Sequence, residues 1–340
     1  MKDPFAKQSL RVAVIGGGTG SFTILSRLKH YTNQIAAIVS MADDGGSTGV
    51  LRDEFGTLPS GDVRQCLVAL SDSPKVRDLF SYRFEEGTFH GHSFGNLLLT
   101  TLEKIEGDFN AAVDTASEIL RVNGVVIPAT LDNVRLKMEW PHKSVVLHGE
   151  RVIDAEYFKS DPRRAEISLV PTAHVNQTAI TAIEQADIII VAPGDLYTSL
   201  GPLLVIDGIG EALRRSHALK FYVSNLVSKQ GQTDGFTVHD HAAEIERFAG
   251  GAFLDYVLYN SAKPERAVAS KYRAEGDSLT RYDAKQARAV GYKAVGGAFL
   301  GAIADHKPSN SHFSVKRSLI RHDADAVIKE ILAIYQRDRE

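Results

Sequence analysis

The stretch VAVIGGGTGS, residues 12–21, decides the fold class of this chain. Four apolar residues run into a segment with four glycines, a pattern that predicts a buried strand, a glycine loop and then a helix. Glycines allow positive φ angles and close ligand approach, and the start of a helix offers free N–H groups to an anion. The expected ligand group is a phosphate. The alternative is a tight strand-to-helix turn that binds nothing.

The glycine loop does not match the common nucleotide motifs. The dinucleotide fingerprint G-x-G-x-x-G ends on Ser21 when counted from Gly16, and on Thr23 when counted from Gly18. No Lys-Ser/Thr pair of a P-loop follows. We therefore expect no NAD, and an NAD-binding oxidoreductase is disfavoured.

Composition narrows the class of protein. The 340 residues are 44% hydrophobic and 24% charged with a net charge of −3, as in a globular protein with a full core. Acids and bases are interspersed, so we expect no nucleic-acid partner. Cys66 is the single cysteine and lies in an apolar helical pattern, which excludes intrachain disulfides and favours a core position. The apolar runs are too short for a secretory segment or a membrane span, and we expect a cytoplasmic protein.

Short apolar runs alternate with helical patterns along the chain. The expected strands are residues 11–15, 35–40, 186–192, 220–226 and 255–260. The expected helices are residues 21–31, 61–72, 93–105, 108–121 and 323–337. Continuous apolar strands are typical of parallel sheets covered on both faces, so the sequence predicts an α/β fold with a doubly wound, mostly parallel sheet. We treat residues 1–340 as one domain.

Two regions depart from this alternation. Residues 125–170 alternate in places around a turn at residues 141–144, which predicts an antiparallel hairpin appended to the sheet. Residues 262–315 are rich in glycine, lysine and serine and show no clear pattern. A mobile flap is one interpretation of the second region.

Acidic residues follow the second expected strand. Asp43 and Asp44 precede two glycines, and Asp62 lies near the start of the next expected helix. Adjacent carboxylates repel, and a cation or a hydroxyl-rich ligand would relieve the repulsion. The alternatives are an Asx turn for the Asp-Gly pair and a helix cap for Asp62.

Other polar segments also follow expected strands or begin helices. In HGHSFGN, His90 and His92 could ligate a metal, but Ser93 as a helix cap with Asn96 in the first turn is the simpler interpretation. The stretch VAPGDLYTSLGP is a second strand-end anion loop, with hydroxyl donors at residues 197–199. Asn225 ends a strand, and Asp234 belongs to a turn before a helix whose His239 and His241 we interpret as helix-start residues. Loops after parallel strands meet at one sheet edge, where α/β ligand sites lie.

Seven blocks together resemble the gluconeogenesis factor family, the YvcK-like proteins, which are related to the 2-phospho-L-lactate transferases (CofD-like proteins). The blocks are VIGGGTGS, ADDGGSTGVLRDEFGTLPSGDVRQCLVALSD, GHSFGNLLLTTL, PATLDNVRL, PGDLYTSLGPLL, QTDGFTVHDH and IRHDADAV. The resemblance spans residues 10–260 and 318–335. The Asp-Asp-Gly-Gly and Gly-His-Ser-Phe-Gly-Asn blocks are highly specific in combination.

The resemblance implies a Rossmann-like three-layer fold and a cytoplasmic protein that binds UDP-sugars such as UDP-N-acetylglucosamine. Such a protein supports cell-wall synthesis and cell shape during gluconeogenic growth, with no firm catalytic activity. In the related transferases a divalent cation sits on aspartates that match Asp44 and Asp62. In the gluconeogenesis branch an arginine of an Arg-His-Asp block helps to hold the UDP-sugar, and it matches Arg321. A guanidinium suits a diphosphate because it donates two parallel hydrogen bonds.

The chain departs from the family pattern at three places. Thr23 stands where the transferases carry a lysine, which favours the regulatory branch. Ala192 and Asp195 replace a glycine and a serine, and an aspartate in an anion loop repels phosphate unless a cation bridges it. The stretch at residues 285–317 is longer than usual and matches poorly.

The sequence therefore predicts a nucleotide-sugar sensor that does not turn its ligand over. The alternative is a Mg²⁺-dependent transferase that moves a phospho-acyl group from a guanosine diphosphate donor to a hydroxyl acceptor. Mg²⁺ is the one cofactor expected, and we expect a homo-oligomer such as a dimer. The expected ligand-binding residues are Gly17, Gly18, Thr19, Gly20, Asp43, Asp44, His92, Asn96, Gly194, Tyr197, Thr198, Asn225, Asp234 and Arg321, and the expected metal ligands are Asp44 and Asp62.

Overall fold

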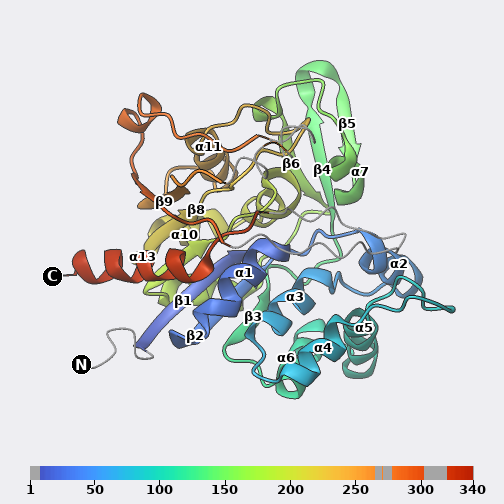
Figure 1. The fold of residues 1–340 in the computed structure, drawn as a ribbon. Coiled ribbons are helices and arrows are strands. Elements are labelled where there is room, and N and C mark those ends of the chain that lie inside the picture. Colours follow the sequence, from blue (N-terminus) through green and yellow to red (C-terminus); the bar gives the residue numbers. More distant parts are fainter. Residues whose placement is uncertain (1–7, 265–269, 271–277, 302–319, 340) are drawn as a thin grey trace.

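A seven-stranded parallel sheet forms the centre of the molecule, in the order β10-β9-β8-β7-β1-β2-β3 (Figure 1). The computed structural model describes residues 8–264, 270, 278–301 and 320–339. The strands are β1 (Gln8–Gly16), β2 (Thr32–Val39), β3 (Val125–Pro128), β7 (Ile188–Val191), β8 (Leu219–Val223), β9 (Tyr256–Asn260) and β10 (Lys293–Gly297). All five expected strands are present, which confirms the α/β prediction.

The central strands are apolar throughout because both faces of the sheet are covered. In β1, Val12 and Val14 pack into the core on one face, while Ala13 and Ile15 pack into the core on the other. All four residues of β7 are buried. A strand buried on both faces reads as a continuous apolar run, which is the pattern that predicted these strands.

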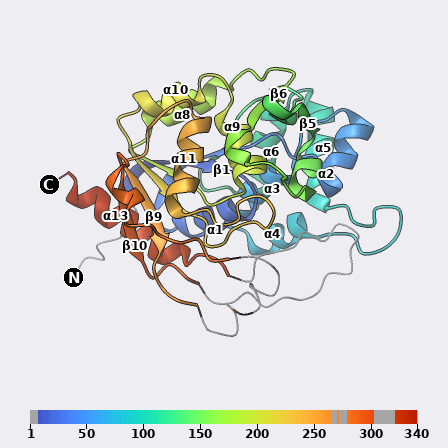
Figure 2. The same cartoon turned by 90° about the horizontal axis from the view of Figure 1, so that it is seen from above.

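Helices cover each face of the sheet, giving three layers; Figure 2 shows α8 and α10 on one side of β1 and α1 on the other. One face carries α1 (Gly18–Leu28), α3 (Gly61–Leu70), α4 (Pro74–Ser81), α5 (Phe94–Glu106), α6 (Phe109–Leu120) and α13 (Ala324–Arg337). The other carries α8 (Gln177–Gln185), α9 (Gly201–Leu204), α10 (Ile209–Arg215) and α11 (Val238–Phe248). Cys66 is fully buried in the first of these cores, as predicted.

A small antiparallel sheet, in the order β5-β4-β6, stands beside the parallel one. Its strands are β4 (Arg135–Trp140), β5 (Val145–His148) and β6 (Glu166–Val170), and the turn η1 (Pro141–Lys143) joins the first two. The predicted hairpin is therefore confirmed, with one correction. Residues 125–128 form β3, which pairs in parallel with β2, so the excursion begins at β4.

Part of the region without a clear pattern belongs to the parallel sheet. Strand β10 pairs with β9, and η4 (Gln286–Arg288) precedes it. The prediction missed β10 because its five residues, KAVGG, include two glycines and a lysine. The rest of the flap interpretation, at residues 265–269, 271–277 and 302–315, lies outside the described residues.

The order of the strands creates a switch point between β1 and β7. The chain runs outward from β1 through β2 to β3, and later outward in the other direction from β7 through β8 and β9 to β10. Ligand sites of open α/β sheets lie at the carboxyl ends of the strands beside such a point. Within the described ranges, none of the helices is both long enough and apolar enough to cross a bilayer.

Candidate functional site

A cleft of about 960 Å³ opens at the carboxyl edge of the parallel sheet. The loops after β1, β2, β7 and β8 line it, together with the segment before α13. The predicted convergence of strand-end loops is therefore present in the structure. The predicted site residues that line the cleft are Gly17, Gly18, Thr19, Gly20, Asp43, Asp62, Asn96, Gly194, Thr198, Asn225 and Arg321.

The glycine loop brings the N-terminus of α1 to the floor of this cleft. Gly17 is the N-cap and supplies no side-chain cap, and no acidic residue stands in the first turn. The loop also packs against the loop after β7, since a Cβ on Gly20 would fall 1.7 Å from the carbonyl oxygen of Pro193. The backbone of α1 thus faces the cleft beside the switch point, as an anion site at a helix start requires.

Two carboxyl groups from different loops lie beside the glycine loop. Asp62, in the first turn of α3, accepts a hydrogen bond from the Gly18 backbone, and Asp43 accepts one from Gly45 N at 2.9 Å. Burial, followed by the charge of Asp43, raises the pKa of Asp62 to about 7. Burial also raises the pKa of Asp43. A proton or a cation must therefore accompany this pair near neutral pH.

Asp44 does not share this position. Its carboxylate accepts hydrogen bonds from Glu150 N at 3.2 Å and Arg151 N at 2.7 Å, at the start of α7 (Glu150–Ala155), and pairs with Arg135 Nη1 at 3.3 Å. The side chain is 7% exposed and is not among the cleft-lining residues. Asp44 therefore acts as a cap for α7, and Asp43 takes the place beside Asp62 that the sequence analysis gave to Asp44.

Glu150 is a third carboxyl group in the cleft, and the sequence analysis missed it. Burial, together with the charges of Asp43, Asp154, Asp44 and Asp62, raises its pKa to about 9. It comes from α7, which follows the antiparallel strand β5 rather than a strand of the main sheet. No local pattern in the sequence marks it as a site residue.

We expect Glu150→Gln to increase stability at high pH. The folded protein holds the proton of Glu150 more tightly than the unfolded chain does, so the free energy of unfolding falls as pH rises from 4.5 toward about 9. In metal-free buffer the variant should gain roughly 2 kcal/mol at pH 9 and little at pH 5. Denaturant titrations at the two pH values measure this. Glu118→Gln, on the exposed side of α6, is the control, and an equal gain in both variants would contradict the explanation.

The Gly-His-Ser-Phe-Gly-Asn block is mainly structural. Ser93 caps α5 by accepting from Asn96 N at 3.5 Å, which confirms the simpler interpretation of this block. His92 Nδ1 lies 3.1 Å from Ser47 Oγ and does not line the cleft. The Asn96 side chain does line it, and accepts from Arg64 Nε at 2.8 Å. This contact places a guanidinium in the cleft that the sequence analysis did not identify.

Asp195 in the second anion loop forms an ion pair with a lysine, Lys229. Lys229 Nζ lies 3.0 Å from Asp195 Oδ2 and also contacts Asp154. Lys229 follows Asn225 by four residues, and Asn225 joins the same loop because its Nδ2 donates to the Gly194 carbonyl at 2.8 Å. Lys229 therefore partly neutralises Asp195, and it shares that charge with Asp154.

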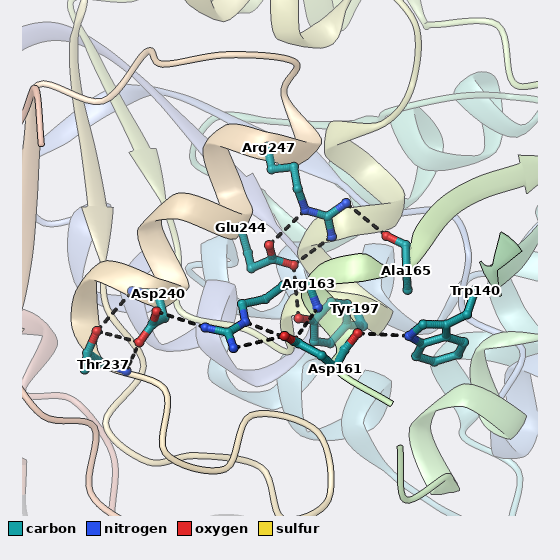
Figure 3. A network of polar contacts seen from close by, with 9 residues as sticks. All are labelled: Trp140, Asp161, Arg163, Ala165, Tyr197, Thr237, Asp240, Glu244 and Arg247. Atoms are coloured by element: carbon teal, nitrogen blue, oxygen red, sulfur yellow. Dashed lines mark hydrogen bonds and ion pairs between the residues drawn. The ribbon is translucent and has the colours of Figure 1, made fainter. Parts of the chain in front are cut away.

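Besides Asp44 and His92, two more predicted ligand-binding residues, Tyr197 and Asp234, lie away from the cleft. Tyr197 is 1% exposed, and its hydroxyl donates to Glu244 Oε2 at 3.0 Å, within the network that Figure 3 shows. Arg247 pairs with the same carboxylate at 2.7 Å. Asp234 is exposed in its turn and accepts from Gly231 N at 2.6 Å. Tyr197 faces inward because it belongs to the short helix η3 (Leu196–Leu200), which packs against α9 and α11.

Arg321 reaches the cleft on a segment tied to two strands. Gly301 N donates to the Arg321 carbonyl at 2.8 Å, and Asp323 N donates to the Phe299 carbonyl at 2.8 Å. His322 Nε2 donates to the Ser224 carbonyl, 3.1 Å away, just after β8. Burial lowers the pKa of His322 to about 4, so the imidazole is neutral and acts as an anchor. The residue that would hold a diphosphate is thus fixed beside the strand-end loops.

Comparison with known proteins agrees with this geometry. A family model described as 2-phospho-L-lactate transferase CofD matches residues 12–300. The gluconeogenesis factor of Bacillus subtilis (strain 168) is 37% identical over 323 residues, which are 94% of this chain and 96% of the relative. A putative gluconeogenesis factor of Thermotoga maritima is 38% identical over 318 residues, 93% of this chain and 96% of the relative. The chain belongs to the gluconeogenesis factor family.

Solved structures support the family assignment at the level of the fold. The crystal structure of a member of the UPF0052 family from Bacillus halodurans superposes with a TM-score of 0.84 at 34% identity, covering 95% of this chain and 99% of that one. The Rossmann-like three-layer architecture implied by the motifs is therefore confirmed.

The carboxyl groups of the cleft fit the divalent cation that the relationship of this family to the transferases implies. Asp43 and Asp62 both line the cleft, and burial raises the pKa of each, with the charge of Asp43 adding to the rise at Asp62. In the described part of the chain, no group of three or more histidine, cysteine or acidic residues is arranged to hold a metal alone. Mg²⁺ suits such a site, since it often binds through one or two carboxylates and completes its shell with substrate phosphates.

Proposed function

We propose that this gluconeogenesis factor binds a nucleotide-sugar of the UDP-N-acetylglucosamine type and acts as a cytoplasmic sensor in cell-envelope homeostasis. The observation that carries the proposal is the position of Arg321 in the same cleft as the glycine loop of α1. A guanidinium and the free N–H groups of a helix start together neutralise a diphosphate. The relatives named gluconeogenesis factor support the regulatory half of the proposal.

Unpartnered hydroxyls support a ligand in the cleft. Within the described residues, Ser40 Oγ and Thr198 Oγ1 are buried and have no hydrogen-bond partner. Both residues line the cleft. A buried hydroxyl without a partner costs free energy, and a ligand with phosphate and hydroxyl oxygens would satisfy both groups.

A transferase is the second candidate function. The family model described as 2-phospho-L-lactate transferase and the buried carboxyl groups of Asp43 and Asp62 favour it, because phosphoryl chemistry requires positioned cations. Thr23, in place of the transferase lysine, lines the cleft and argues against it. We rank the sensor first because the glycine loop offers only backbone donors and Thr19 beside the helix start.

Calorimetry tests the ligand, and a turnover assay tests the chemistry. We expect saturable binding of UDP-N-acetylglucosamine, weaker binding of GDP and none of NAD, each measured with and without Mg²⁺. Incubation with UDP-N-acetylglucosamine and Mg²⁺ should release no UDP at enzymatic rates. Preferential binding of GDP, or steady release of UDP, would contradict the sensor function and favour the transferase function.

A separate prediction concerns the cation. Asp62→Asn and Asp43→Asn should each weaken Mg²⁺ binding to the nucleotide complex about tenfold or more, because each removes a charged ligand. Asp44→Asn should lower the melting temperature through loss of the α7 cap and leave the Mg²⁺ titration unchanged. Isothermal titration of the three variants with Mg²⁺, at saturating UDP-N-acetylglucosamine, distinguishes them. Weakened Mg²⁺ binding in Asp44→Asn and Asp62→Asn, with Asp43→Asn unchanged, would restore the assignment made from the sequence.

A further inference from the structure

One arm of the cleft differs from the rest in chemistry. We call it the α7 arm and define it as Asp154, Tyr157, Asp195 and Lys229, all of which line the cleft. Tyr157 is 58% exposed, and it is the one tyrosine, phenylalanine or tryptophan among the cleft-lining residues that the structure describes. An exposed aromatic ring inside a polar cleft offers an apolar surface to a ligand.

The ring of Tyr157 is held in place by its neighbours. It lies over Gly231, where a Cβ would fall 2.5 Å from its Cδ1 atom. Next to it, Phe158 N donates to the Gly231 carbonyl at 2.8 Å. Gln232 Nε2 donates to the Ile153 carbonyl at 2.7 Å, which ties the end of α7 to the same loop. The approach of the ring to Gly231 and the contacts of its neighbours position Tyr157, which limits the entropy lost on binding.

The charges of the α7 arm are unsuited to a diphosphate. Two carboxylates, Asp154 and Asp195, share one ammonium group on Lys229. Burial alone would lower the pKa of Lys229, but the two carboxylates outweigh it and raise the pKa, so the lysine stays charged. Asp154, Asp195 and Lys229 together carry a net negative charge, although Arg151 of α7 also lines the cleft. Phosphates are favoured near Arg321 and the glycine loop instead.

A neutral, hydroxyl-rich group suits this arm. Hydroxyls donate to carboxylate oxygens and accept from an ammonium, so such a group can use all three charged side chains at once. A uracil ring fits less well, because it offers two carbonyl acceptors and a single N–H donor to an arm with two carboxylates and one ammonium. The apolar C–H face of a sugar can lie against the tyrosine ring.

We propose that the α7 arm is the subsite for the sugar of the nucleotide ligand, with Tyr157 against the apolar face of the sugar and Asp154, Asp195 and Lys229 on its hydroxyls. The inference rests on the proposed function. It adds the part of the cleft that contacts the sugar rather than the nucleotide. The diphosphate then lies between Arg321 and α1. Discrimination among UDP-sugars then falls to Asp154, Tyr157 and Lys229, which lie outside the family motifs, and to Asp195, where this chain departs from the family serine.

The test compares two ligands in calorimetry, UDP-N-acetylglucosamine and UDP, with the full chain. Tyr157→Ala should weaken binding of the UDP-sugar about tenfold and leave that of UDP within about twofold. Tyr157→Phe should bind both ligands as the parent does. Asp154→Ala should weaken binding of the UDP-sugar and should leave the affinity for UDP unchanged or higher. Phe89→Ala removes an aromatic ring of similar exposure, 53%, outside the cleft and should change neither.

The failures of the two proposals are distinct in this experiment. If the parent protein does not bind UDP-N-acetylglucosamine, the proposed function itself is wrong. If the parent binds it and Tyr157→Ala loses affinity equally for both ligands, the ring contacts the base or ribose, and the sugar subsite is overturned. Unchanged affinity for both ligands in Tyr157→Ala also overturns it.

Discussion

Gly18→Val is expected to abolish nucleotide-sugar binding, raising Kd by at least about 100-fold, or about 2.7 kcal/mol. Gly18 is the first residue of α1 and has a φ of +61°, a conformation that β-branched residues rarely adopt. A Cβ there would lie 3.7 Å from Asp62 Oδ1, so the added side chain would stand between the helix start and the cleft. Calorimetry with UDP-N-acetylglucosamine measures the loss.

The control for this variant is Gly56→Val. Gly56 ends α2 (Gly46–Phe55), has a φ of +67° and has nothing within 4 Å of its added Cβ. Both variants therefore force a valine into a positive-φ conformation, but only Gly18 lines the cleft. We expect similar losses of melting temperature, with full binding retained in Gly56→Val. Binding at parental affinity by Gly18→Val would show that the phosphate lies elsewhere. Thr19→Ala, at an exposed position of the same loop, should weaken binding only mildly.

Arg321→Ala is expected to weaken nucleotide-sugar binding by about 10- to 150-fold, since a hydrogen bond to a charged group contributes about 1.5–3 kcal/mol. Among the residues that the structure describes, the hydrogen bonds that hold this segment are made by main-chain atoms and by the His322 side chain, not by the Arg321 side chain. The variant should therefore keep its fold. The loss should appear for UDP as well as for UDP-N-acetylglucosamine, because the guanidinium is expected to contact the diphosphate. This shared loss distinguishes Arg321 from Tyr157.

Arg337→Ala provides the matched control for charge. Arg337 lies at the end of α13, with 64% of its side chain exposed, and does not line the cleft. Removing it changes the net charge by the same amount. If both variants lose affinity equally, the effect is long-range electrostatics, and raising the salt concentration should remove it. If neither loses affinity, Arg321 has no role in binding.

The elements that could be predicted from sequence are those whose signal is local. The segments that form β1, β2, β7, β8 and β9 contain apolar runs because these strands are covered on both faces, and the apolar character of a side chain can be read from the sequence. β10 escaped prediction because its partner β9 supplies the pairing that its own glycine-rich sequence does not suggest. β3 was placed in the wrong sheet, since four residues do not specify whether they pair with β2 or with a hairpin.

The same distinction holds at the site. The glycine loop and Asn225 were found because each follows a strand, and parallel strands deliver such residues to one edge. Asp62 was found because it lies at the start of a helix. Asp43 and Asp44 are adjacent and chemically identical in the sequence. Only the packing of α7 decides that Asp44 caps a helix while Asp43 faces the cleft.

The sequence by itself determined the α/β class, the position of the anion loop and the family, because these follow from local patterns and from shared motifs. Tertiary structure alone decided that Glu150, Tyr157 and Lys229 belong to the site. Two of the three stand on or beside α7, a helix between strands β5 and β6 of the antiparallel sheet, and the third stands in a loop more than 70 residues later. Their meeting depends on how that sheet packs against the parallel one, which is a sum of many weak long-range contacts that no local pattern records.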